Sequence, residues 1–219
     1  MSNSNFDVSK RLHSTNSIFN FQFSIFNCVC VLLFVVLLIT SCKKDEEKPS
    51  IEIWKQQNEK VFNDLAFNPD YTELWMPGAA ASIYYRVIQK GEGKRVFYNS
   101  RAEVYYKGWF VATNTDLNIE AGTVFDQKLF DDGTVFKVAI SSQAADANYV
   151  TVITGWSIAL QYMVEGDKWE VHIPYHLAYG ENDVSAIPGF TTLAFEIELI
   201  KAIDPDEYST STGSGSSYY

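Results

Sequence analysis

The chain of 219 residues is poor in the side chains that most often carry chemistry, with three cysteines and three histidines. Cys28 and Cys30 lie within an apolar N-terminal stretch, and no cysteine follows Cys42. Disulfides, thiolate metal sites and cysteine nucleophiles are therefore excluded from the rest of the chain. His172 and His176 have no H-x-x-H spacing and no cysteine partner, so we expect them at the surface. The sequence predicts no metal and no cofactor.

Positive charge is also scarce, because 17 Lys and Arg face 27 Asp and Glu, for a formal net charge of −10. Sequence-independent binding to nucleic acid needs clustered basic residues that release counterions, so nucleic acid is excluded as a partner. No glycine-rich phosphate loop joins a strand to a helix, and Ser157 lies outside a G-x-S-x-G pattern. The aromatic content of 15% instead allows one well-packed domain with polar ends.

Residues 1–41 have the features of a signal peptide, with a basic pair ahead of an apolar run from about Ile25 to Ile39. The run ends in Leu-Ile-Thr-Ser-Cys, which resembles a bacterial lipobox and implies that Cys42 receives the lipid. An uncleaved anchor helix over Phe23–Ile39 is the alternative. Both interpretations export the remaining chain, and we expect an anchored protein in the outer membrane.

Two further polar segments flank the predicted domain. Residues 42–49 form a charged tether that is either a solvated spacer or, behind an acylated cysteine, an export signal of the kind that sends some Gram-negative lipoproteins to the cell surface. Residues 205–219 end in a run of Ser, Thr, Gly and Tyr, which predicts a disordered tail.

Between the tether and the domain, residues 50–78 indicate a helical extension. The three- and four-residue spacing of apolar positions predicts a helix over Ser50–Phe67 that packs on the main domain. Asn-Pro-Asp at residues 68–70 and Met-Pro-Gly at 76–78 are typical of turns and mark the join. The apolar stripe comprises Ile51, Trp54, Val61, Phe62 and Leu65.

In residues 79–204 apolar side chains recur at every second position, which predicts half-buried antiparallel strands. Apolar residues alternate with more polar ones along four runs, which begin at Ile83, Ala102, Trp169 and Leu193. One segment differs, because Trp156, Leu160 and Met163 have helical spacing. The fold class is therefore α+β, with one short helix against the concave face of a curved antiparallel sheet.

Several motifs in series resemble those of FKBP-type peptidyl-prolyl cis-trans isomerases. Val152-Ile153-Thr154-Gly155-Trp156 with the Met-x-x-Gly at 163–166 is similar to the family's central segment. The others are V-x-Y-x-G at 104–108, G-x-x-F-D at 122–126, Tyr-Gly at 179–180, Ile-Pro at 187–188 and the closing strand at 193–199. The resemblance covers about residues 79–203, more than half the chain.

This resemblance implies an aromatic cleft that binds X–Pro segments and assists the folding of exported polypeptides. Its implied catalytic residues are Tyr106, Phe125, Asp126, Phe136, Trp156 and Tyr179. The residues implied to bind substrate are Val152, Ile153, Ile187 and Phe195.

Three departures from the family pattern concern the cleft's surroundings. The basic residue that often follows the F-D motif is replaced by Gln127, so Asp126 would contact Tyr106 or Lys128 instead. An insertion spans residues 113–121, and the loop at 181–186 is remodelled. These departures leave open a non-catalytic module that binds proline-containing peptides.

Overall fold

The computed structural model describes residues 50–76, 78 and 81–209. The predicted signal peptide, lipidated Cys42 and tether lie outside the described residues. Within the described part of the chain, no helix is both long enough and apolar enough to cross a membrane.

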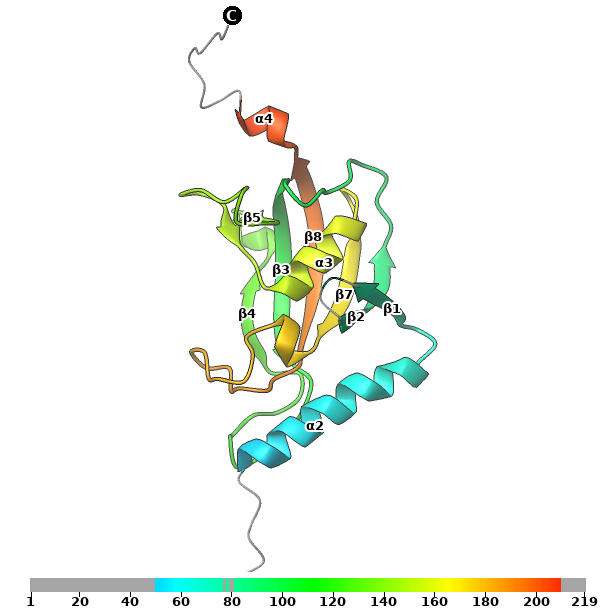
Figure 1. The fold of residues 1–219 in the computed structure, drawn as a ribbon, viewed down its shortest axis with the longest axis vertical. Helices are drawn as coiled ribbons and strands as arrows, with labels where there is room; N and C mark the ends of the chain where they lie inside the picture. The colour runs from blue at the N-terminus through cyan, green and yellow to red at the C-terminus, as the bar shows by residue number, and fades with distance from the viewer. Residues whose placement is uncertain (1–49, 77, 79–80, 210–219) are drawn as a thin grey trace, which may run out of the picture. The chain divides into compact units, whose positions relative to one another are not determined.

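One curved sheet forms the body of the domain, with the strand order β1-β2-β7-β8-β3-β5-β6 and with β4 also paired to β3 (Figure 1). All described pairings are antiparallel except that of β5 with β6. The strands are β1 Thr72–Met76, β2 Ala81–Gln89, β3 Arg101–Phe110, β4 Val124–Lys128, β5 Phe136–Ala139, β6 Val150–Thr151, β7 Lys168–Ile173 and β8 Leu193–Ile203. The predicted α+β class is confirmed.

The core lies between this sheet and helix α3, Thr154–Tyr162, which crosses its face in Figure 1. Trp169, Val171 and Ile173 of β7 are buried, as their alternation predicts. Gly155 lets the helix approach β7, because a Cβ there would lie 2.3 Å from the Ile173 side chain. The central motif therefore has a glycine where helix and sheet pack together.

Helix α2, Ser50–Asp64, packs on the domain as predicted and continues into the 3₁₀ turn η1, Leu65–Phe67. Trp54 is fully buried in the core, and the Phe62 ring contacts Tyr84 of β2 with centroids 5.1 Å apart. Asn58 is also fully buried, although its polarity places it outside the apolar stripe. Its amide is bonded to the domain, so polar contacts as well as apolar ones hold α2.

Two of the predicted boundaries need correction. The helical extension of residues 50–78 includes strand β1, which forms a hairpin with β2 in the register Met76↔Ala81. The predicted disordered tail begins with helix α4, Pro205–Ser209, where Glu207 pairs with Lys94 at 2.7 Å. Strand β1 is held by its hairpin with β2, and helix α4 by a contact with a residue distant in sequence. The remaining short turns are η3, Phe130–Asp132, and η4, Tyr175–Leu177.

The expectation for the two histidines is correct for only one of them. His176 is exposed, but His172 is 7% exposed and its ring is covered by Tyr71, with centroids 5.1 Å apart. Its Nε2 lies 2.9 Å from a Glu170 carboxylate oxygen. His172 does face the polar side of its strand, and the segment leading into β1 buries it there.

Candidate active site

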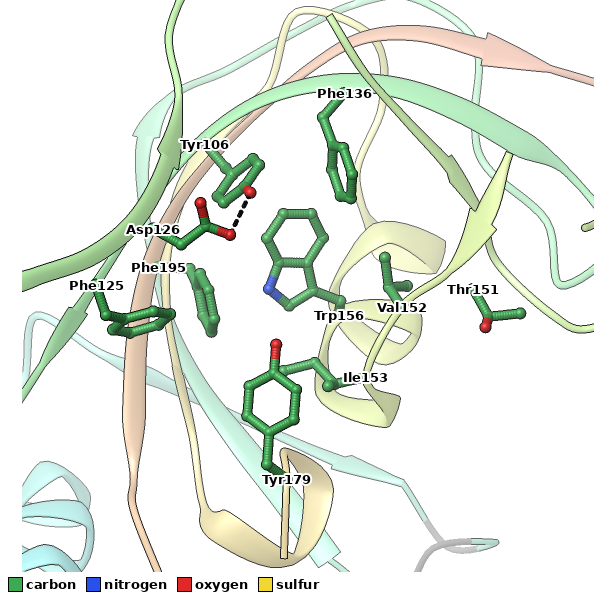
Figure 2. A pocket seen from close by; sticks show the side chains of 10 residues that line it. All are labelled: Tyr106, Phe125, Asp126, Phe136, Thr151, Val152, Ile153, Trp156, Tyr179 and Phe195. Atoms are coloured by element: carbon green, nitrogen blue, oxygen red, sulfur yellow. Dashed lines mark hydrogen bonds between the residues drawn. The ribbon is translucent and has the colours of Figure 1, made fainter. Parts of the chain in front are cut away.

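Trp156 forms the floor of a pocket of about 160 Å³ beside α3 (Figure 2). The helix places its indole at the centre of a ring of aromatic side chains, and only 3% of the residue is exposed. The Tyr106 and Phe195 rings meet the indole edge-on, with centroids 5.1 and 5.3 Å away. Edge-to-face packing of this kind holds the rings in fixed orientations. The pocket is therefore a rigid apolar cavity.

The walls come from strands β3, β4, β5 and β8, which converge beside the helix. Phe125 of β4 packs on Phe195 of β8 with centroids 5.6 Å apart, and Phe136 of β5 lies 6.3 Å from Trp156. Gly108 of β3 allows this approach, because a Cβ there would lie 2.7 Å from both Phe125 and Phe195. The glycine of the V-x-Y-x-G motif thus leaves room for two wall residues.

Asp126 and Tyr106 form the polar edge of the pocket. The Tyr106 hydroxyl donates a hydrogen bond to the Asp126 carboxylate over 2.6 Å, drawn in Figure 2. Burial and this bond to a carboxylate raise the pKa of Tyr106 far above its usual range, so the hydroxyl stays protonated. Of the two contacts expected for Asp126, the structure contains the one with Tyr106. The ion pairs between described side chains include none to Lys128.

The opposite edge combines the start of α3 with the segment after η4. Val152 and Ile153 precede the helix, and the Ile153 carbonyl accepts the Trp156 N–H at 3.0 Å. The Tyr179 hydroxyl points into the pocket toward the indole (Figure 2), and 41% of this residue is exposed. Burial and the nearby Asp126 carboxylate raise the pKa of Tyr179. Two protonated phenols therefore face the cavity from opposite sides.

One donor in the pocket has no partner among the described residues. The Trp156 Nε1 is buried and makes no hydrogen bond there. A buried polar group without a partner costs free energy unless something in the cavity accepts from it.

Nine of the ten predicted site residues line this pocket. Ile187 does not: it is 8% exposed, lies in the core cluster and pairs its backbone with Val184. Thr151 lines the pocket but was not predicted, and its position next to Val152 was the available signal. The residues that the structure brings together are Tyr106, Phe125, Asp126, Phe136, Val152, Ile153, Trp156, Tyr179 and Phe195.

Comparison with known proteins gives one consistent family. The family model described as FKBP-type peptidyl-prolyl cis-trans isomerase matches residues 92–200. The FKBP-type 22 kDa peptidyl-prolyl cis-trans isomerase of Escherichia coli (strain K12) is 35% identical over 125 residues, which are 56% of this chain and 51% of that protein. Outer membrane protein MIP of Legionella longbeachae is 28% identical over 147 residues, 67% of this chain and 55% of that one.

A solved structure also matches this chain, over nearly the whole length of the solved protein. The crystal structure of a peptidyl-prolyl cis-trans isomerase from Pseudomonas syringae pv. tomato str. DC3000 has a TM-score of 0.54 and 30% identity, and the match covers 72% of this chain and 98% of that one. This chain spans only about half the length of each of the two curated relatives. The fold, the order of the motifs and these similarities agree, and the chain belongs to the FKBP-type peptidyl-prolyl cis-trans isomerase family.

Proposed function

We propose that this chain is a peptidyl-prolyl cis-trans isomerase that acts on proline-containing segments of exported polypeptides. The observation that carries the proposal is the aromatic pocket around Trp156, which joins an apolar cavity to a few fixed hydrogen-bond donors. The family that the comparisons show supports the same activity.

The reaction needs no nucleophile, because rotation about an amide bond breaks no covalent bond. Its barrier of ~18–20 kcal/mol comes from amide resonance. For X–Pro bonds the two isomers differ by only about 0.5–1 kcal/mol, so the catalyst changes the rate and leaves the equilibrium almost unaltered. A pocket without histidine or thiol side chains suits this chemistry.

Desolvation supplies the proposed rate acceleration. Water stabilises the planar, charge-separated amide more than the twisted one, which has less charge separation. An amide that moves from water into the space between Trp156, Phe136 and Phe195 loses that stabilisation, and the planar form loses more of it. Binding the twisted form better than the planar form lowers the barrier.

The fixed donors would orient the substrate. The Tyr179 hydroxyl faces the pocket (Figure 2). Ile153 lines the same pocket, and its N–H makes no backbone hydrogen bond within the described residues, so it would be free to bond a peptide carbonyl. Asp126 would hold the Tyr106 ring in place through its hydrogen bond and would exchange no proton. Thr151 extends the same edge and would contact the residue beside proline.

The same proposal places the domain outside the cytoplasm as a folding factor. Support comes from the lipobox-like segment ending at Cys42 and from a relative named as an outer membrane protein. Cys42 would be the lipidated first residue after removal of residues 1–41, and residues 42–49 would tether the isomerase domain to the membrane.

The activity is tested with a short X–Pro peptide in a protease-coupled assay on purified residues 43–219. We expect faster isomerisation with the wild type, strong loss with Trp156→Leu, and a shift of tryptophan emission on peptide binding that disappears in that variant. Binding without acceleration would favour a peptide-binding module over an enzyme. Native circular dichroism of Trp156→Leu is the control.

The anchor is tested separately in cells with labelled fatty acid. Cys42→Ala should leave an unprocessed precursor without label, whereas Cys28→Ala and Cys30→Ala, matched changes within the signal peptide, should be processed and labelled normally. Labelling of Cys42→Ala would overturn the lipoprotein proposal and leave the isomerase proposal intact.

A further inference from the structure

Helix α2 makes buried polar contacts with two successive residues that immediately precede β8. The Trp54 Nε1 donates to the Thr191 hydroxyl over 2.9 Å, across 137 positions of sequence. The Asn58 side-chain oxygen accepts the Thr192 N–H at 2.9 Å, and its backbone oxygen accepts the Thr192 hydroxyl at 3.3 Å. All four residues are at most 3% exposed. Such bonds are costly to break, because each would leave a buried group unpaired.

The residue just before this pair, Phe190, is also held by α2. The Lys55 Nζ lies 4.6 Å from the centre of the Phe190 ring, and Tyr175 packs on that ring edge-on at 5.3 Å. Phe190 has φ 61°, in the left-handed region that a bulky side chain rarely adopts. Such a conformation costs free energy and persists only where surrounding contacts hold it. Helix α2 supplies part of that restraint.

Phe190 is hydrogen-bonded to Gly180, the residue after Tyr179, whose phenol lies at the edge of the pocket. The Phe190 N–H donates to the Gly180 carbonyl at 2.9 Å, so it closes the loop of residues 180–190 at its base. The Tyr175 carbonyl accepts the N–H groups of Ala178 and Gly180, on both sides of Tyr179, at 3.0 and 2.8 Å. Of the residues that α2 contacts, Phe190 therefore holds the backbone next to Tyr179 through its bond to Gly180.

We infer that α2 is a positioning element of the prolyl site, in which Trp54 and Asn58 fix the Phe190–Thr192 junction and thereby the Tyr179 hydroxyl. This inference rests on the proposed isomerase function. The N-terminal extension, outside the family match at residues 92–200, then contributes to activity without touching substrate. Misplacement of a binding group by about 1 Å can cost up to a hundredfold in rate, so contacts far from the chemistry can matter this much.

The test uses Trp54→Phe, which removes the indole donor together with part of the buried ring volume and keeps an aromatic ring in the core, together with Asn58→Ala. We expect kcat/KM for an X–Pro peptide to fall about threefold to tenfold in each variant, with native circular dichroism. Hydrogen exchange should become faster at the Gly180 and Phe190 amides. Gln57→Ala is the matched control, because Gln57 lies on the same helix and its contact is with Asn114 at 3.4 Å. It should retain wild-type values in both measurements.

A second comparison separates positioning from general support of the fold. If α2 acts through the Tyr179 hydroxyl, Trp54→Phe should cost almost nothing further in a Tyr179→Phe background. The inference would be overturned if the losses in kcat/KM of Trp54→Phe and Tyr179→Phe multiply in the double variant. Unchanged hydrogen exchange at residues 180–190 in both α2 variants would overturn it as well. If the wild type binds proline peptides without isomerising them, the proposed function fails on its own. Exchange and peptide affinity in the same variants would still decide whether α2 positions Tyr179.

Discussion

At the scale of single residues, the pocket depends on rings that hold one another in place. Trp156 contacts Tyr106, Phe136 and Phe195 edge-on, and each ring removes water from the space above the indole. The hydrogen bond between Tyr106 and Asp126 orients one wall and carries no proton in the proposed reaction. The contributions of pocket shape and of hydrogen bonding to the isomerisation rate can therefore be separated by substitution.

We expect Phe136→Ala to lower kcat/KM by about tenfold or more, which corresponds to about 1.4 kcal/mol of transition-state stabilisation. Truncation opens the pocket to water and removes packing against the twisted proline. Asp126→Asn should cost less than about threefold by the same relation, because the amide oxygen can still accept the Tyr106 hydroxyl. The peptide assay measures both, and a larger loss in Asp126→Asn would contradict this order.

The pH profile is a second test at this scale. The Tyr106 and Tyr179 hydroxyls face the pocket, and burial raises the pKa of each above its ordinary value near 10. Both therefore remain protonated at neutral pH, and kcat/KM should be nearly flat between about pH 6 and 8.5. Replacement of His172 and His176 together should leave this profile unchanged in a folded protein. A bell-shaped curve near neutrality would indicate acid–base catalysis.

At the scale of elements, the site depends on how closely β3, β4 and β8 approach. Gly108 stands where Phe125 and Phe195 both cross β3, and no Cβ fits there. The motif glycine is thus a packing requirement of three strands, and neither wall residue is positioned by its own strand alone.

Gly108→Ala should displace both rings and destabilise the domain by about 1–3 kcal/mol, the usual cost of overpacking a well-filled core. Activity should fall more than stability predicts, because the two rings line the pocket. Urea unfolding and the peptide assay measure the two effects. Gly133→Ala provides the contrast, because a Cβ there meets nothing within 4 Å and its cost comes only from its positive φ of 69°. Full activity in Gly108→Ala would contradict the packing account.

At the scale of the whole molecule, a partly buried carboxylate joins distant parts of the chain. Glu170 of β7 accepts hydrogen bonds from Tyr71 at 2.5 Å and from Arg86 of β2, and His172 lies beside it. Burial alone would raise the pKa of Glu170, but bonds from His172, Tyr71 and Arg86 outweigh it and lower that pKa to about 2. The carboxylate form therefore stabilises the fold.

Because the folded pKa lies below the ordinary value of 4.5, this stabilisation is present above about pH 4.5 and is lost as the pH falls toward 2. We expect a loss on the order of 2 kcal/mol from this group over that range. Urea midpoints of the wild type should fall more steeply across the window than those of Glu170→Gln. Parallel curves for the two proteins would show that Glu170 does not carry the acid sensitivity.

The sequence alone determined the α+β class and a short helix that includes Trp156 and Leu160, and the resemblance of its motifs to the FKBP-type family implied nine of the residues that line the pocket. Those features follow from local spacing and from motifs whose order is fixed along the chain. Tertiary structure decided the rest. The burial of Asn58 and His172 and the contact of α4 depend on partners far away in sequence. Polarity predicts exposure for such residues when those partners are unknown. Ile187 lies in the core for the same reason, because only the path of the loop decides which side its side chain faces.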